Sequence, residues 1–288
     1  MAELMVMTDP KLYRKYIRIE VEKPVLYAKL RKALYGTLKA ALLFWKPLSK
    51  TLQKWGFIAN PYDPCVGNKQ INGSQCTILW HVDDLKISHK DESVVTAVIK
   101  QLNDEFGRKA PLTVTRGKIH EYLGMTIDYS LDGKVMISMK EYIKSMLEEL
   151  PDDMGGESAT PAGTRLFQVN EEGTKLGEEQ AILFQHNTAK LLFLCKRARP
   201  DIQPSVAFLC TCVKEPDHDD YKKLARVMRY LRGTPEQVLT LEAQNMSIVK
   251  WWVDTSFAVH PDMRSRTGAV CPTREVILCC LFVGWVRV

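Results

Sequence analysis

The sequence predicts an α+β fold built from antiparallel β-hairpins and amphipathic helices. Two observations predict the hairpins. The apolar run 76–82 is followed at once by the run 85–88, and the strand candidates 122–129 and 134–139 flank a Ser-Leu-Asp-Gly turn. A third observation predicts the helices: apolar residues recur at helical spacing in segments before, between and after these hairpins.

The helices follow from apolar residues that recur three or four positions apart. The pattern covers four segments: 37–55, 91–106, 140–150 and 217–232. Within the first, Pro47 lacks the N–H of a helical hydrogen bond, so we expect it to kink or split the helix. The last is the most regular, because apolar and basic residues occupy separate stripes and Gly233 supplies a stop.

The composition excludes a disordered or fibrous protein, since hydrophobic residues make up 45% and charged residues 26%. The longest apolar run, Val276–Val283, is far shorter than the ~20 residues of a membrane span. The amino terminus also lacks the pattern of a signal peptide. We therefore expect no membrane partner and a cytoplasmic or nuclear location.

The net charge of +6 is unevenly distributed along the chain. Residues 1–50 hold 11 basic and 4 acidic side chains, residues 111–180 hold 7 and 13, and residues 181–288 hold 15 and 10. Two basic ends therefore flank an acidic middle, and basic surfaces attract polyanions such as nucleic-acid backbones. A solvated basic surface without a partner is the alternative.

The segment Trp80–His89, WHVDDLKISH, carries the sharpest chemical pattern. Neighbouring side chains on a flat strand point to opposite faces, so Asp83 and Asp84 converge only if the backbone bends there. Two adjacent carboxylates repel each other unless a cation lies between them, and Mg²⁺ prefers such oxygen ligands. A pair of these ions about 4 Å apart assists phosphoryl transfer. Taken alone, the motif more often means a solvated acidic turn.

Five motifs, in one order, resemble those of copia-type retrotransposon polymerases. The Asp83-Asp84 hairpin resembles the Tyr-x-Asp-Asp motif of reverse transcriptases, with His81 in the tyrosine position. The others are KLRKALYGTLKAALLFW at 29–45, HEYLGMTIDY at 120–129, the pair RARPDIQPSVAFL and YKKLARVMRYLRGT at 197–209 and 221–234, and KWWVDTSFAVHPDMRSRTGAV at 250–270. The chain is thereby identified as similar to a piece of a copia-type Pol polyprotein.

This resemblance implies roles for individual residues. Asp83 and Asp84 would be two of three palm carboxylates, with Asp83 a direct ligand of Mg²⁺ or Mn²⁺ and Asp84 tuning or sharing the site. The residues expected near template, primer or incoming nucleotide are Tyr35, Gly36, Lys39, Leu123, Gly124 and Met125. The helix that contains Lys222, Lys223, Arg226 and Arg229 would contact phosphates, with a solvated basic face as an equal alternative. Asp254 would be the first carboxylate of a ribonuclease H site.

The resemblance also divides the chain. We expect a partial palm and the start of the thumb in residues 1–150, an acidic linker in 151–180, and a helical thumb or connection segment in 181–245. The first strands of a ribonuclease H-like domain and a divergent tail would occupy 246–288. The implied partners are an RNA template, a DNA primer and deoxynucleoside triphosphates.

Two departures from the family pattern predict that the chain alone is inactive. The third palm carboxylate would lie upstream of Tyr35, and residues 1–28 contain nothing that resembles its strand. Its loss is expected to slow nucleotidyl transfer about a thousandfold. The tail after Val270 holds the single acid Glu275, so we expect no ribonuclease H activity.

The missing strand would also leave residues 76–82 as an apolar sheet edge, through which the chain would self-associate.

Three functions stay open at this point. The chain is a truncated RNA-directed DNA polymerase, a nucleic-acid-binding remnant without catalysis, or a decayed element without function.

Overall fold

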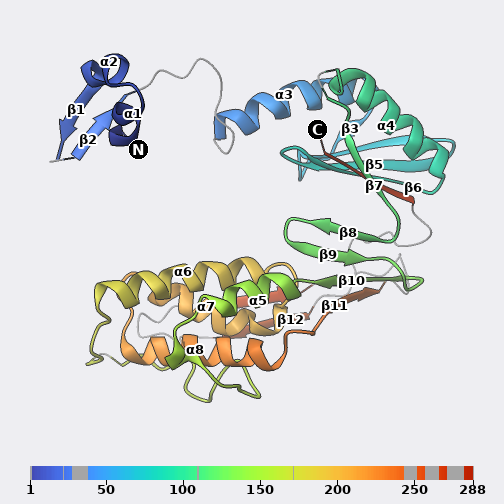
Figure 1. Ribbon diagram of the computed structural model, residues 1–288. Coiled ribbons are helices and arrows are strands. Elements are labelled where there is room, and N and C mark those ends of the chain that lie inside the picture. Colours follow the sequence, from blue (N-terminus) through green and yellow to red (C-terminus); the bar gives the residue numbers. More distant parts are fainter. Residues whose placement is uncertain are drawn as a thin grey trace. The chain divides into compact units, whose positions relative to one another are not determined.

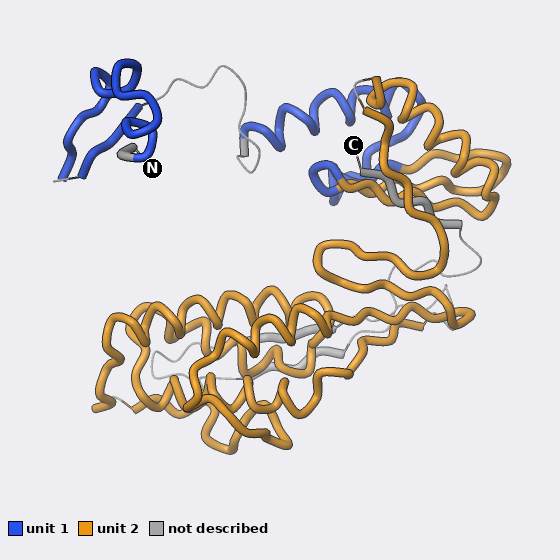
Figure 2. The backbone as a smooth tube through the Cα atoms, in the orientation of Figure 1, with its two compact units in different colours: residues 1–67, 81–83 blue, residues 68–80, 84–288 orange. Residues whose placement is uncertain are grey.

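The computed structural model describes residues 2–21, 23–27, 38–108, 110–170, 172–242, 252–256, 266–270 and 282–287. The chain divides into two compact units (Figure 2), one of residues 1–67 and 81–83 and the other of residues 68–80 and 84–288. Among the described residues, no helix is long and apolar enough to cross a membrane.

The first unit is mostly helical. Its elements, in chain order, are α1 (Ala2–Thr8), α2 (Pro10–Tyr13), a 3₁₀ turn (Arg14–Tyr16), the hairpin of β1 (Ile17–Glu20) and β2 (Lys23–Leu26), α3 (Leu38–Lys54) and β3 (Ile58–Ala59). The helix α3 runs unbroken through Pro47, so the predicted split does not occur. It ends in a Schellman motif, because Gly56 has a φ of 85° and the N–H of Phe57 donates to the C=O of Leu52.

A six-stranded sheet carries the Asp83-Asp84 hairpin. Its strands, in spatial order, are β3, β4 (Val66–Ile71), β5 (Ser74–His81), β6 (Asp84–His89), β14 (Phe282–Arg287) and β7 (Thr113–Arg116). The predicted hairpin of two strands joined at the acidic pair is confirmed by β5 and β6. Burial alternates along β5, where Cys76, Ile78 and Trp80 are buried, as expected for a strand with one face in a core.

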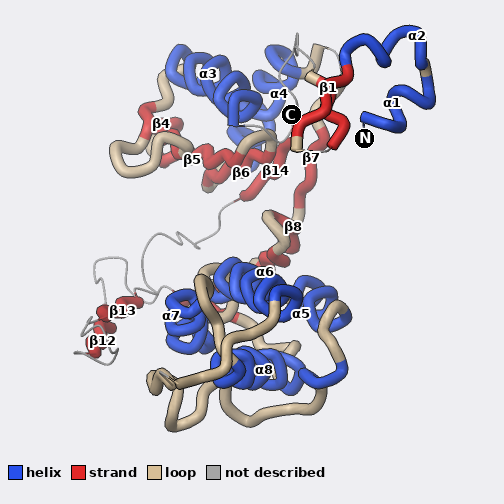
Figure 3. Tube along the Cα trace, turned by 90° about the vertical axis from the view of Figure 1, so that its left-hand side faces the viewer, coloured by secondary structure: helices blue, strands red, loops and turns tan. Residues whose placement is uncertain are grey.

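The prediction that residues 76–82 form an exposed sheet edge is wrong. β5 is an internal strand, because β4 flanks it on one side and β6 on the other. Figure 3 shows β14 between β6 and β7, and β14 pairs antiparallel with both. Asp84 is paired with Arg287 in this register. The sheet therefore gives no support for self-association through β5.

The predicted helix after β6 is confirmed as α4 (Glu92–Phe106). The side chain of Asp91 caps it by accepting a hydrogen bond from the N–H of Ser93 at 2.9 Å. Val95 and Leu102 are fully buried, so the helix turns its apolar stripe inward.

A second, antiparallel sheet follows β7. Its strands, in spatial order, are β11 (Leu239–Glu242), β10 (Lys134–Ser138), β9 (Met125–Asp128) and β8 (Ile119–Tyr122). β9 and β10 confirm the second predicted hairpin. Further along the chain, β12 (Trp252–Ser256) and β13 (Arg266–Val270) form a separate antiparallel pair.

The helices after β10 lie side by side as a bundle (Figure 1), and their buried residues form one hydrophobic core. They are α5 (Lys140–Glu148), α6 (Glu178–Cys195), α7 (Gln203–Cys212) and α8 (His218–Gly233). Phe184, Leu209 and Leu224 are fully buried in this helical bundle. α8 matches the most regular predicted helix, and Asp217 and Asp220 close its first turn as a capping box.

One arginine is almost completely buried where α7 and α8 meet the loop after α8. Arg199 is 1% exposed, and its Nη2 forms an ion pair with Asp201 Oδ2 at 2.8 Å. The same guanidinium donates to the backbone C=O of Thr234 at 2.8 Å and to Gln237 Oε1 at 3.2 Å. Tyr230 completes the network by donating its hydroxyl to Asp201 at 2.9 Å. These bonds satisfy a charge that burial would otherwise make costly.

Residues 151–170, here called the strap, pack against the bundle although their composition predicted a linker. Met154, in the short 3₁₀ helix Asp152–Met154, is fully buried and belongs to the bundle core. Leu166 is 8% exposed. The strap is therefore held by apolar side chains at two points.

Arginines of α8 also hold the strap. Arg229 donates to the C=O of Gly155 at 2.7 Å and to the C=O of Asp153 at 2.9 Å. Arg232 donates to the carbonyl oxygens of two further strap residues at 2.9 and 3.1 Å. The contacts use the strap backbone as acceptor, so they fix its path without using its acidic side chains.

Candidate active site and nucleic-acid interface

The turn between β5 and β6 places the two predicted metal-binding aspartates at the bend. Val82 and Asp83 form the turn, and Asp84 is the first residue of β6. Both aspartates are half-buried, and Val82 is 38% exposed. The strands thus hold an acidic pair at an end of the sheet that water can reach.

This turn is strained. Val82 has a φ of 54°, which is a genuine outlier for a β-branched residue. The neighbouring β4–β5 turn has φ values of 52° and 71°, but its residues are Asn72 and Gly73, which tolerate that conformation. A left-handed backbone costs other L-residues about 1–2 kcal/mol. Such strain clusters at functional sites, where the surrounding structure holds it in place.

The predicted primer-binding segment also lies at a strained turn. Leu123 and Gly124 have φ values of 51° and 74°, and Tyr122 pairs with Met125 across them. Two central residues with positive φ make a type I′ hairpin turn, which favours Asn or Asp at its first position. A leucine at position 123 therefore lowers the stability of this turn relative to Asn or Asp. Leu123 and Met125 are half-buried, whereas Gly124 is exposed.

We expect Leu123→Asn to raise the free energy of unfolding by about 1 kcal/mol, because asparagine tolerates the left-handed conformation that leucine resists. Urea unfolding followed by circular dichroism measures this change. The reciprocal exchange Asn72→Leu, in the β4–β5 turn, is the matched control and should destabilise by a similar amount. A Leu123→Asn protein less stable than the unsubstituted protein would show that packing of the leucine outweighs its backbone strain.

The remaining predicted site residues belong to other elements or lie outside the described residues. Tyr35 and Gly36 lie outside the described residues. Lys39 is exposed in the first turn of α3. Asp254 lies in the middle of β12, where it pairs with Gly268 of β13.

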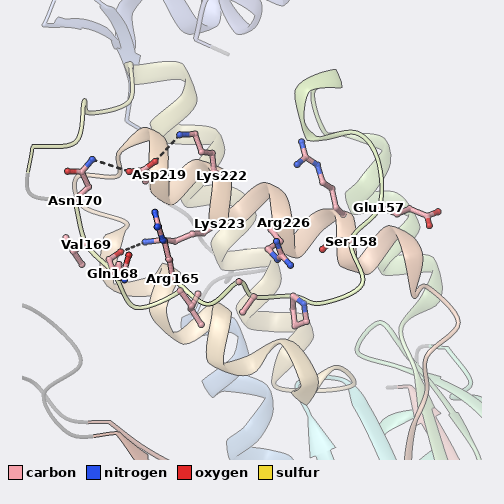
Figure 4. A pocket seen from close by; sticks show the side chains of 15 residues that line it. Glu157, Ser158, Arg165, Gln168, Val169, Asn170, Asp219, Lys222, Lys223 and Arg226 are labelled. Carbon is pink, nitrogen blue, oxygen red and sulfur yellow. Dashed lines mark hydrogen bonds and ion pairs between the residues drawn. The ribbon is translucent and has the colours of Figure 1, made fainter.

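The predicted phosphate-binding residues of α8 divide by their contacts. Lys222 forms an exposed ion pair with Asp219 at 3.0 Å (Figure 4). Lys223 donates to the C=O of Gln168 at 2.6 Å. Arg226 and Arg229 donate to the strap and are half-buried. Three of the four side chains therefore help to hold the strap, a role that the sequence did not indicate.

Residues 13–161 match the family described as reverse transcriptase (RNA-dependent DNA polymerase), and this segment is more than half of the 288-residue chain. The chain belongs to the reverse transcriptase family. The matched segment contains both hairpins that the resemblance singled out, with Asp83, Asp84 and Leu123–Met125. The predicted relationship to copia-type retrotransposon Pol polyproteins is confirmed.

Several relatives of this reverse transcriptase family member are transposon proteins. The chain is 24% identical over 242 residues to a putative transposon Ty5-1 protein of Saccharomyces cerevisiae, which covers 83% of the chain and 76% of that protein. It is 25% identical over 253 residues to the retrovirus-related Pol polyprotein from transposon TNT 1-94 of Nicotiana tabacum. That match covers 85% of the chain and 19% of the polyprotein, so the chain spans less than a fifth of its length. No solved structure matches the chain.

Reverse transcriptases generally use divalent metal ions. Asp83 and Asp84 fit this chemistry, because carboxylates are hard oxygen donors. Among the described residues, however, no group of three or more His, Cys, Asp or Glu side chains is arranged to hold a metal ion. In the part of the chain that the structure describes, Asp83 and Asp84 therefore belong to no such group.

Two buried residues, His89 and Arg199, were not predicted from the sequence. His89 is 1% exposed at the end of β6, where its Nδ1 accepts from the N–H of Asp91 at 3.0 Å and its Nε2 lies 3.1 Å from the C=O of Ile71. Arg199 forms the buried network described above. A buried histidine or arginine produces no periodic pattern in the sequence. The Arg-Pro-Asp motif is the one signal that could have indicated a structural role for Arg199.

Proposed function

We propose that this chain supplies the palm hairpins and the helical thumb or connection region of an RNA-directed DNA polymerase. The partners would be an RNA template, a DNA primer and deoxynucleoside triphosphates, in the cytoplasm or nucleus. The observation that carries the proposal is the strained β5–β6 turn, which presents Asp83 and Asp84 inside a segment that matches the reverse transcriptase family. Strain at a turn with two carboxylates is more easily explained by function than by folding.

In this proposal the aspartates act as part of a larger ligand set. Asp83 holds Mg²⁺ or Mn²⁺ directly, and Asp84 tunes or shares the site. Leu123, Gly124 and Met125 press the primer end toward the palm, and the strained turn keeps Leu123 in its position. Lys39, together with Tyr35 and Gly36, contacts template or nucleotide. Because the carboxylate set is incomplete among the described residues, we propose that the chain alone does not polymerise.

Primer extension on an RNA template, with Mg²⁺ or Mn²⁺, tests the activity of the full chain. We expect no extension above that of the Asp83→Asn/Asp84→Asn protein, since a missing metal ligand costs about a thousandfold in rate. Metal-dependent extension that disappears in Asp83→Asn would contradict the proposed inactivity.

The metal-binding role has its own test. Mn²⁺ titration followed by electron paramagnetic resonance should show weak binding that Asp83→Asn or Asp84→Asn abolishes. Asp132→Asn is the matched control, because Asp132 is an exposed aspartate in another hairpin loop. Equal Mn²⁺ binding by all of these proteins would exclude the hairpin as a metal ligand.

A second candidate function is nucleic-acid binding without catalysis. The incomplete carboxylate set favours it, and the basic residues of α8 provide the cations. A mobility shift of RNA that weakens with salt and persists in Asp83→Ala would support this function.

We also propose that residues 246–288 begin a ribonuclease H-like domain. The support is the antiparallel β12–β13 pair, with Asp254 at the centre of β12. No ribonuclease H activity is expected from this chain. Metal-dependent cleavage of an RNA–DNA hybrid that is lost in Asp254→Ala would contradict that expectation.

A further inference from the structure

A lysine shares a strand face with one of the two candidate metal ligands. Burial alternates along β6, where Leu85 and Ile87 are fully buried while Asp84 and Lys86 are half-buried. Alternate residues of a strand lie on the same face, so Asp84 and Lys86 share the face opposite the buried residues, about 7 Å apart along the strand. The acidic turn therefore has a cation two residues away on the same side of the sheet.

Contacts with the second sheet restrain the ammonium of Lys86. Its Nζ lies 5.5 Å from the ring centroid of Tyr129, the residue that follows β9. The ring of Tyr129 makes an edge contact with the ring of His120 in β8, with the centroids 6.1 Å apart. His120 is 2% exposed, and its Nε2 lies 2.9 Å from the C=O of Gly117. A cation over an aromatic face is attracted to it, so Lys86 joins β6 to the β8–β9 hairpin.

The charge of Lys86 also reaches His120. Burial is the main cause that lowers the pKa of His120 below its ordinary value of 6.5; the hydrogen bond to Gly117 opposes this shift, and the charge of Lys86 adds to it. The imidazole is therefore neutral at neutral pH. Lys86 thus keeps its charge between the acidic turn and an aromatic cluster that has none.

We propose that Lys86 is a positioning residue of the nucleotidyl-transfer site, which weakens the hold of the acidic turn on a free divalent ion and fixes the β8–β9 hairpin to β6. The inference rests on the proposed function and deepens it. Two carboxylates and one ammonium leave a net charge of −1, which attracts a divalent ion less than −2 does. The acidic turn then binds such an ion firmly only when further negative ligands join it.

The test is the Mn²⁺ affinity of the full chain, measured by electron paramagnetic resonance, with and without Lys86→Gln. Removal of one positive charge about 7 Å from the ion should tighten binding roughly threefold to tenfold near 0.1 M salt. The gain should shrink in 1 M salt, where the Debye length is about 3 Å. Lys86→Arg keeps the charge and should keep the weak affinity. Loss of a merely structural contact would give neither tighter binding nor this dependence on salt.

The matched control is Lys90→Gln, which removes the same charge from an exposed position just after β6. Lys90 is six residues from Asp84, about 20 Å along an extended chain, so screening should leave the Mn²⁺ affinity unchanged. Equal tightening by Lys90→Gln would overturn the proposal, because it would reduce the effect to net charge. An unchanged affinity in Lys86→Gln would overturn it as well.

Hydrogen exchange tests the hold on the hairpin without any metal. Lys86→Gln loses the cation–π contact, so the amides of β8 and β9 should exchange about two to five times faster, while those of α8 keep their protection. Unchanged exchange in β8 and β9 would overturn the proposal.

Failure of this inference and failure of the proposed function give different results. Mn²⁺ binding that Asp83→Asn abolishes but Lys86→Gln leaves unchanged contradicts the role of Lys86 alone. Absence of Mn²⁺ binding in every protein contradicts the proposed metal site, and with it the effect of Lys86 on that site.

Discussion

Replacement of Arg199 by alanine is expected to lower the free energy of unfolding of the helical bundle by about 3–5 kcal/mol. The substitution leaves Asp201 without its ion-pair partner and removes the arginine donors to the C=O of Thr234 and to Gln237 Oε1. The effect is large because Arg199 is buried and its removal takes several hydrogen bonds and the ion pair from the interior, although Asp201 keeps the hydroxyl of Tyr230 as a donor. Urea unfolding followed by the helical circular dichroism signal measures it.

Arg199→Lys should recover little of this loss. Arg199 donates through Nε, Nη1 and Nη2 to three different residues, and a lysine ammonium cannot reproduce that fork. The matched control is Lys196→Ala, which removes an exposed cation three residues away and should change stability by less than about 0.5 kcal/mol. A loss below 1 kcal/mol in Arg199→Ala would contradict the importance of the network.

The same network predicts a dependence on pH. Burial alone would raise the pKa of Asp201, but the hydrogen bond and charge of Arg199 outweigh it and hold that pKa below its ordinary value of 3.8. A carboxyl with a depressed pKa stabilises the fold above its unfolded pKa. The contribution is therefore complete at neutral pH and is lost as the pH falls below about 4 and through the folded pKa. Asp201→Asn should remove this part of the acid sensitivity.

Met154→Ala is expected to destabilise the bundle by about 2–5 kcal/mol, because the methionine is fully buried and its removal leaves a cavity. The strap should detach at the same time, since Met154 is one of its two apolar anchors. Hydrogen exchange of the amides in the strap and in α8 measures both effects.

Met7→Ala is the control for this substitution. Met7 is 78% exposed, so its removal should change stability by less than about 0.5 kcal/mol. A fully protected strap in Met154→Ala would show that the arginine contacts alone hold it.

The elements with a local signal were predictable from the sequence. α4 and α8 appear almost where apolar spacing and the flanking Asp and Gly residues placed them. Both predicted hairpins formed, because alternating burial and turn residues are encoded within a few positions. Each family motif is a short run of neighbouring residues, so the reverse transcriptase family was predictable from the sequence alone.

Long-range pairings were not predictable. β14 pairs with β6 across about 200 residues, with Arg287 opposite Asp84, and no local pattern specifies such a register. The predicted apolar edge was wrong for another reason, because β4 pairs with the free side of β5. The strap was taken for a linker because its acidic composition hides two buried anchors, Met154 and Leu166. The strain at Val82 and Leu123 depends on backbone geometry that residue types do not reveal.

The clamp between α8 and the strap has a consequence for how this region changes in evolution. Arg229 and Arg232 donate hydrogen bonds to the main-chain oxygens of residues 153–156, and every amino acid has such an oxygen. Substitutions among the exposed strap residues therefore leave the grip intact, whereas substitution of either arginine breaks several bonds at once. In related chains we therefore expect Arg229, Arg232 and Met154 to be retained, while the exposed acidic residues of the strap vary. The strap can therefore tolerate many side-chain substitutions and still keep a fixed backbone path.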